Sequence, residues 1–160
     1  MKKSKTLTKL LDRCSKSVIE THSFRNDDTA IIVKDDLMKV MAYLKDEPDL
    51  RYDMMMDITA VDYLGEDPRF EVVYHLYSVE FNTRIRIKTR VSEAECIINS
   101  VTPLWASANW FEREVYDLYG IHFNGHPELR RILMYEEFKG HPLRKDYPIN
   151  KRQPLIGPIN

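Results

Sequence analysis

The stretch RFEVVYHLYSVEFNTRIRIKTRV, residues 69–91, decides the fold class of this 160-residue chain. From Arg84 to Val91, cations alternate strictly with Ile, Thr and Val, the pattern of a strand with one buried face. From Arg69 to Val79, the chain is largely apolar on both faces, which predicts a central strand covered on both sides. Asn82 lies in the turn between them. The stretch therefore predicts two consecutive strands of a sheet.

Two more strands are expected upstream of this stretch. Residues 51–63 predict the first strand of a three-strand meander, which ends at turn residues from Gly65 to Pro68. Residues 29–33 predict a short apolar strand after a polar turn at residues 22–28.

Amphipathic helices are predicted around that short strand. Apolar residues recur at helical spacing from Thr6 to Val18 and again after Asp35, and Thr6 and Asp35 are candidate N-caps. Beyond the meander, Ser92 and Glu95 have the spacing of a capping box. Together these elements predict an α+β fold of two layers, in which helices pack on a mixed sheet that contains the meander.

Composition excludes several classes of function. Lysine plus arginine number 24 and aspartate plus glutamate 25, which argues against a dedicated nucleic-acid-binding protein. Cys14 and Cys96 are far apart and form no CxxC motif, so a disulfide scaffold, a zinc ribbon and an iron–sulfur site are not expected. No stretch approaches the roughly 18 apolar residues of a membrane helix. The acid-free start, residues 1–9, leaves an organelle presequence as an alternative to a plain first helix.

A third helix is predicted from Asn109, where Asn109 caps the helix and Glu112 reaches back to it. The apolar stripe of this helix consists of Phe111, Val115 and Leu118, and Arg113 is spaced to pair with Asp117. Gly120 occupies the position of a left-handed residue that ends the helix.

A small internal repeat follows the third helix. The pentapeptide FNGHP at residues 123–127 returns as FKGHP at residues 138–142, and each copy is followed by a leucine and two cations. A segment with this pattern is expected to extend along a protein surface and not to pack in a core. We therefore expect a core domain at residues 1–124 and an extended arm at residues 125–160 that orders mainly on a partner, because its apolar residues are sparse.

The run NWFEREVYDLYGIHFNGHPELRRILMYEEFKGHPLRKDYP, residues 109–148, closely resembles the signature of the 30 kDa subunit family. This family is the C-type subunit of the proton-translocating NADH:quinone oxidoreductase, respiratory complex I. The resemblance extends upstream through DITAVDY, residues 57–63, and RFEVVYHLYS, residues 69–78. Many members continue into a longer acidic and aromatic tail that this sequence lacks.

The resemblance implies a non-catalytic subunit of the peripheral arm of the complex, on the cytoplasmic side of the cell inner membrane. It implies no cofactor in this chain, with FMN and iron–sulfur clusters in partner subunits. The implied partners are the quinone-site subunit, of the D type, and iron–sulfur subunits of the B and I types. A homologous subunit of a membrane-bound hydrogenase or of a dehydrogenase with another electron donor is the alternative.

We expect no catalytic and no metal-binding residues, but a set of interface or structural residues in the last third of the chain. This set comprises Glu112, Arg113, Glu114, Asp117, Gly120, His126, Pro127, Arg130, Arg131, Gly140, Pro142, Arg144, Lys145 and Asp146.

Two other interpretations of these side chains remain open. Carboxylates of the third helix with His122 and His126 could bind a metal, although closed metal sites need three or four convergent ligands. Asp117 with one of these histidines could also serve a small stand-alone hydrolase, although no nucleophile elbow or HExxH motif is present.

Two groups of cations could meet anions. The outward cations of residues 84–90 fit an anionic partner or a solvated sheet face. The cations of the repeat could bind phosphate or lipid headgroups, but the acidic residues interleaved with them favour salt bridges to a protein partner.

Overall fold

A computed structural model describes residues 4–150 and 152–154 of the chain. In chain order the elements are α1 (Lys5–Cys14), the 3-10 helix η1 (Ser15–Ser17), β1 (Val18–Phe24), β2 (Asp27–Ile32), the 3-10 helix η2 (Lys34–Asp36), α2 (Leu37–Asp46), β3 (Met54–Asp62), β4 (Phe70–Ser78), β5 (Thr83–Val91), β6 (Ile97–Asn99), α3 (Ala108–Tyr119) and β7 (His122–Asn124).

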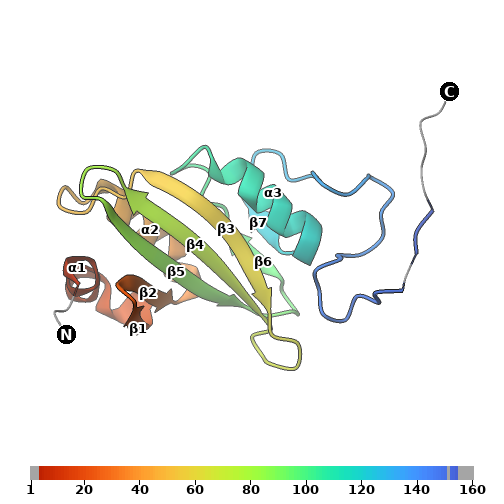
Figure 1. Ribbon diagram of the computed structural model, residues 1–160, viewed down its shortest axis with the longest axis horizontal. Helices are drawn as coiled ribbons and strands as arrows, with labels where there is room; N and C mark the ends of the chain where they lie inside the picture. The colour runs from red at the N-terminus through yellow and green to blue at the C-terminus, as the bar shows by residue number, and fades with distance from the viewer. Residues whose placement is uncertain (1–3, 151, 155–160) are drawn as a thin grey trace.

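Five strands form one mixed sheet in the order β1-β2-β5-β4-β3 (Figure 1). β3, β4 and β5 are antiparallel neighbours, which confirms the three-strand meander. β2 pairs with β5 in parallel and with β1 in antiparallel, so the sheet is mixed as predicted. β6 and β7 form a separate parallel pair that the sequence did not indicate.

The hydrophobic core lies between one face of the sheet and the helices. β5 buries Ile85, Ile87 and Val91 on this face and turns its cations to the other, as its alternation predicted. Tyr74 and Leu76 of the central strand β4 are fully buried against the helices. α2 lies behind the sheet in Figure 1, and within the described residues no helix covers the front of β3, β4 and β5.

The first forty residues depart from expectation in one main respect. The first helix ends at Cys14, and residues 18–24 form the edge strand β1 instead of the end of a helix and a polar turn. β1 is exposed at most positions, so its sequence lacks the strict alternation by which a half-buried strand is recognised. Pairing with β2 across a turn at Arg25 and Asn26 makes this segment a strand.

The predicted N-caps are also shifted. α1 follows Ser4, and Thr6 is buried, with its hydroxyl 2.8 Å from the hydroxyl of Tyr52. α2 follows Asp36, because residues 34–36 form a 3-10 turn. The amide of Glu95 donates to Ser92 Oγ at 3.4 Å, but only a turn follows.

Candidate partner interface

Helix α3 lies beside the edge strand β3, and the segment after Gly125 runs along the helix (Figure 1). Val115 of the predicted apolar stripe is buried, whereas Phe111 and Leu118 are only half-buried. The side chains most deeply buried on α3 include Glu112 and Asp117, both at 0% exposure, and Arg113 at 7%. Charged groups therefore attach this helix to its surroundings.

Glu112 does not cap α3, because the helix begins at Ala108, one residue before the predicted cap. Its carboxylate accepts the amide hydrogen of Val101 at 2.7 Å and the hydroxyl hydrogen of Ser100 at 2.6 Å. Burial raises the pKa of Glu112 to about 7, against the lowering effect of these two hydrogen bonds. Glu112 thus fastens the loop after β6 to the first turns of α3.

Asp117 is the main anchor for the segment after residue 130. One of its carboxylate oxygens accepts the amide hydrogens of Ile132, Leu133 and Met134, at 2.8–3.0 Å. The other oxygen lies 2.6 Å from Nη1 of Arg131. Burial would raise the pKa of Asp117, but the three amides and the arginine lower it overall.

Arg113 does not pair with Asp117 as predicted. Its guanidinium donates to the carbonyl oxygens of Arg130 and Arg131, at 3.2 and 3.1 Å, and stacks against the ring of Trp110. Asp117 is instead occupied by Arg131, which comes from outside the helix. Arg113 and Asp117 therefore do not bind each other, and each binds the segment that follows residue 129.

The two histidines of the repeat bind carbonyl groups of α3. His126 Nε2 lies 3.1 Å from the carbonyl oxygen of Asn109, near the start of the helix, and its Nδ1 accepts the amide hydrogen of Glu128. His141 Nδ1 lies 2.9 Å from the carbonyl oxygen of Asp117, near the end. Since a carbonyl can only accept, the nitrogens facing it must carry the hydrogen. The repeat thus places one contact at each end of α3.

Gly120 ends α3 in the left-handed conformation, at φ 75°, as predicted. The second copy of the repeat packs directly against it, and a Cβ there would lie 2.5 Å from Nε2 of His141 and 2.9 Å from Nη2 of Arg144. Arg144 Nε also donates to the carbonyl oxygen of Tyr119 at 2.5 Å. Gly120 is therefore required both for the turn and for this close approach.

A second anchor of the arm lies where the loop between β3 and β4 joins the two strands, and sequence reasoning missed it. Arg69, 3% exposed, donates two hydrogen bonds of 2.8 Å to the buried Asp62. Arg69 also contacts Glu93 and Asp146, and the amide of Lys145 donates to Asp62 at 2.7 Å. The hydrogen bond from Arg69 lowers the pKa of Asp62.

A signal for this anchor existed in the sequence. Asp62 is in phase with Ile58 and Ala60 along β3, so its carboxylate had to face the buried side of the sheet. A buried carboxylate that stays charged is stabilised by a cation or by hydrogen-bond donors, and Arg69, which immediately precedes the next strand, is a cation close by in the sequence.

Comparison with known proteins decides the family. The pattern described as "Respiratory-chain NADH dehydrogenase, 30 Kd subunit" matches residues 30–153. The chain belongs to this family. It is 47% identical to the C-type subunit of the NADH-quinone oxidoreductase of Geotalea uraniireducens, over 98% of this chain and 96% of the relative. It is 46% identical to the same subunit from Citrifermentans bemidjiense, over 98% of each chain.

Two solved structures share the fold of this chain. The trypsin-resistant fragment (1–134) of Nqo5 superposes with a TM-score of 0.68 and 31% identity, over 77% of this chain and 98% of that chain. A chain of an archaeal membrane-bound sulfane sulfur reductase complex superposes with a TM-score of 0.76 and 27% identity, over 91% of this chain and 85% of that chain.

The predicted interface residues outside the core of α3 fall into three groups. Arg131 and Arg144 were expected to meet carboxylates of a partner, but here they are bound to α3. Exposed residues include Glu114, Arg130 and Lys145. The remaining predicted residues lie along the bends: Pro127 and Gly140 are exposed, Pro142 is half-buried, and Asp146 pairs with Arg69.

The alternative chemical sites find little support among residues 4–150 and 152–154. These residues contain no group of three or more His, Cys, Asp or Glu side chains that could hold a metal. Both carboxylate oxygens of Asp117 are occupied by Arg131 and backbone amides, so the pairing with His122 or His126 that a hydrolase would need is not formed. No helix in the described parts of the chain is long and apolar enough to cross a bilayer.

Proposed function

We propose that this chain is a non-catalytic structural subunit of the peripheral arm of a proton-translocating NADH:quinone oxidoreductase. Membership of the 30 kDa subunit family and the names of its relatives support this assignment. The role needs no active site in this chain. We infer that FMN and the iron–sulfur clusters are bound by partner subunits and that the chain lies on the cytoplasmic side of the inner membrane.

The observation that carries the proposal is the outer surface of α3 and of residues 125–150. Trp110 is 61% exposed, Leu133 57% and Leu143 50%, although each belongs to a segment whose backbone is hydrogen-bonded to the rest of the chain. A tethered backbone with outward apolar side chains is organised before a partner binds, which lowers the entropic cost of association. Exposed apolar and aromatic anchors of this kind are typical of interface centres.

We propose that residues 125–160 form the docking arm on this surface, with Arg130, Lys145 and Glu114 at its polar rim. Residues 151 and 155–160 lie outside the described part of the chain. The partners that fit are the quinone-site subunit of the D type and iron–sulfur subunits of the B and I types. Polar contacts with α3 supply the ordering that the sparse apolar residues of the arm alone would not.

The assignment is tested by isolating the tagged chain from native membranes in mild detergent and identifying the chains that co-purify. We expect an assembly that contains flavin and iron–sulfur subunits and oxidises NADH with a quinone. The isolated chain should show no such activity. Recovery of the chain alone, or turnover by the isolated chain, would contradict the assignment.

The proposed surface is tested with Leu133→Asp combined with Leu143→Asp. Both side chains are at least half exposed, so the fold should retain its stability while recovery of the complex falls. The matched control is Ile19→Asp, because Ile19 is 65% exposed on the distant edge strand β1. Unchanged assembly of the double variant would exclude this surface as the interface.

The second candidate is a homologous subunit of a related membrane complex with another electron donor or acceptor. The likeness to a chain of the archaeal sulfane sulfur reductase favours keeping it. The same purification separates the two, since co-purifying NADH-binding and flavin subunits would support only the first.

A further inference from the structure

The front face of the sheet, opposite α2, is uncovered within the described residues and carries an ordered set of side chains. We call this the front face and define it by the outward residues of β3, β4 and β5. On β3 these are mainly apolar: Met54 is 49% exposed, Met56 40% and Val61 36%. On β5 they are all cations, Arg84, Arg86, Lys88 and Arg90.

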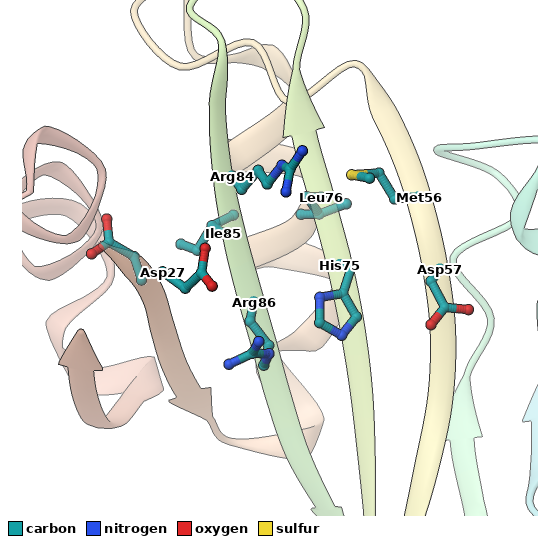
Figure 2. Close-up of a pocket in the computed structure, with 9 residues that line it drawn as sticks. Asp27, Met56, Asp57, His75, Leu76, Arg84, Ile85 and Arg86 are labelled. Carbon is teal, nitrogen blue, oxygen red and sulfur yellow. The ribbon is translucent and has the colours of Figure 1, made fainter. Parts of the chain in front are cut away.

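Cross-strand pairing aligns these side chains in rows. Asp57, His75 and Arg86 are direct neighbours on three strands, and Figure 2 shows His75 between the other two. Met54, Tyr77 and Arg84 form the adjoining row. Each row therefore begins with an arginine on β5. One row ends on β3 at the carboxylate Asp57, and the other ends there at the apolar Met54.

The cations of the front face divide into satisfied and unsatisfied pairs. Lys88 and Arg90 both contact Glu71, at 2.8 and 3.1 Å, and Arg90 also contacts Glu66 at 3.2 Å, so two carboxylates balance these two cations. Among the described residues, neither Arg84 nor Arg86 has a carboxylate oxygen within 4.0 Å. Arg84 stacks on the ring of Tyr77.

Arg86 donates a single hydrogen bond, to Thr29 Oγ1 at 3.2 Å. Arg84 and Arg86 project from alternate positions of one strand, so their side chains are about 7 Å apart at the backbone. The chain therefore presents two neighbouring guanidinium groups with spare donors.

Other charges near these arginines must be counted. Asp27, Asp28 and Asp57 also line the groove of about 380 Å³ that runs across this face, together with Met56 and His75 (Figure 2). They flank Arg84 and Arg86 without forming ion pairs within the described residues. Burial and Arg86 lower the pKa of His75, so the imidazole adds no charge at neutral pH.

We propose that the front face docks an acidic, amphipathic segment of another subunit, with two carboxylates on Arg84 and Arg86 and apolar side chains on Met54, Met56 and Tyr77. The inference rests on the proposed membership of a complex, and it adds a second docking surface, separate from that of the arm. Arginine forks with spare donors bind carboxylates in bidentate fashion. Met, Tyr and Arg are residue types enriched at protein interfaces. Asp27 on β2 and Asp57 on β3 would repel a carboxylate of the partner placed over those strands, which favours a partner whose carboxylates lie over β5.

The test is a photo-crosslinking amino acid at position 56 in the chain as assembled in the detergent-purified complex. We expect a crosslink to a peptide of another subunit that contains two carboxylates spaced to reach both arginines. A control crosslinker at Lys39, exposed on α2 behind the sheet, should give no crosslink to that peptide. A crosslink only to lipid, to a second copy of this chain or to nothing would overturn the proposal.

Charge variants sharpen the result. Arg84→Glu with Arg86→Glu should reduce the crosslink at least tenfold, and the milder Arg84→Gln with Arg86→Gln should reduce it with the melting temperature unchanged. The matched control, Arg13→Glu with Lys16→Glu, reverses two exposed cations near α1 and should leave the crosslink intact.

An unchanged crosslink in the Gln pair would overturn the proposal. So would binding of the isolated chain to phosphatidylglycerol vesicles that depends on Arg84 and Arg86. If the chain is absent from any complex, the proposed function fails instead.

Discussion

Replacing the buried Glu112 with Gln should stabilise the protein at alkaline pH and have little effect at acid pH. Glu112 is 0% exposed, and no cation lies within 4.0 Å of it among the described residues. Its pKa rises from 4.5 to about 7 because burial penalises the charged form. A glutamine keeps the shape and can accept from Val101 and donate to Ser100 without a charge.

The sign follows from proton linkage. The folded state binds this proton more tightly than the unfolded state, so the stabilisation is complete below pH 4.5 and is lost as the pH rises to about 7. At 1.36 kcal/mol per pKa unit, the difference between 4.5 and about 7 corresponds to roughly 3 kcal/mol. For a chain of this size, that corresponds to a shift of about 6–12 °C in melting temperature.

The assay is urea unfolding of wild type and Glu112→Gln between pH 5 and pH 8.5, followed by tryptophan fluorescence. The advantage of the variant should grow steadily with pH and reach its plateau above pH 7. The control is Glu114→Gln on the exposed side of the same helix, which should show no such trend. If the two variants follow the same pH profile, or if Glu112→Gln is less stable than wild type at pH 8.5, the reasoning is refuted.

The contacts of the arm lead to four further predictions. Gly120→Ala should lower stability by about 2 kcal/mol or more, through the left-handed conformation and the collision with His141, and an unchanged melting temperature would contradict this. Asp117→Asn should cost about 2–4 kcal/mol and speed trypsin cleavage of residues 130–150, measured by mass spectrometry. Arg69→Met should lower the free energy of unfolding by about 3–5 kcal/mol, measured by thermal unfolding, because it leaves the buried carboxylate of Asp62 without its cation. An unchanged stability would show that the anchor is not needed. In the isolated wild-type chain, trypsin should cut the arm first after the exposed Lys139 and Lys145, and both sites should be protected in the complex.

Local sequence determined the centre of the fold because each signal there depends on neighbours along the chain. The alternation from Arg84 to Val91 reports one buried face of β5 whatever lies beyond it. Gly120 ends α3 because a residue without a Cβ adopts the left-handed conformation at no steric cost. The run of residues 109–148 likewise identified the family, which the comparisons then showed.

Partners distant in sequence decided the rest. β1 has a weak pattern because an edge strand is exposed, and only pairing with β2 makes it a strand. The helical spacing of Arg113 and Asp117 allowed an internal ion pair, but each side chain bonds instead to a segment 14–18 residues further along. Asp117 is buried, so it forms the arrangement with the most hydrogen bonds, one arginine and three backbone amides, and this option exists only once the arm has folded back over α3.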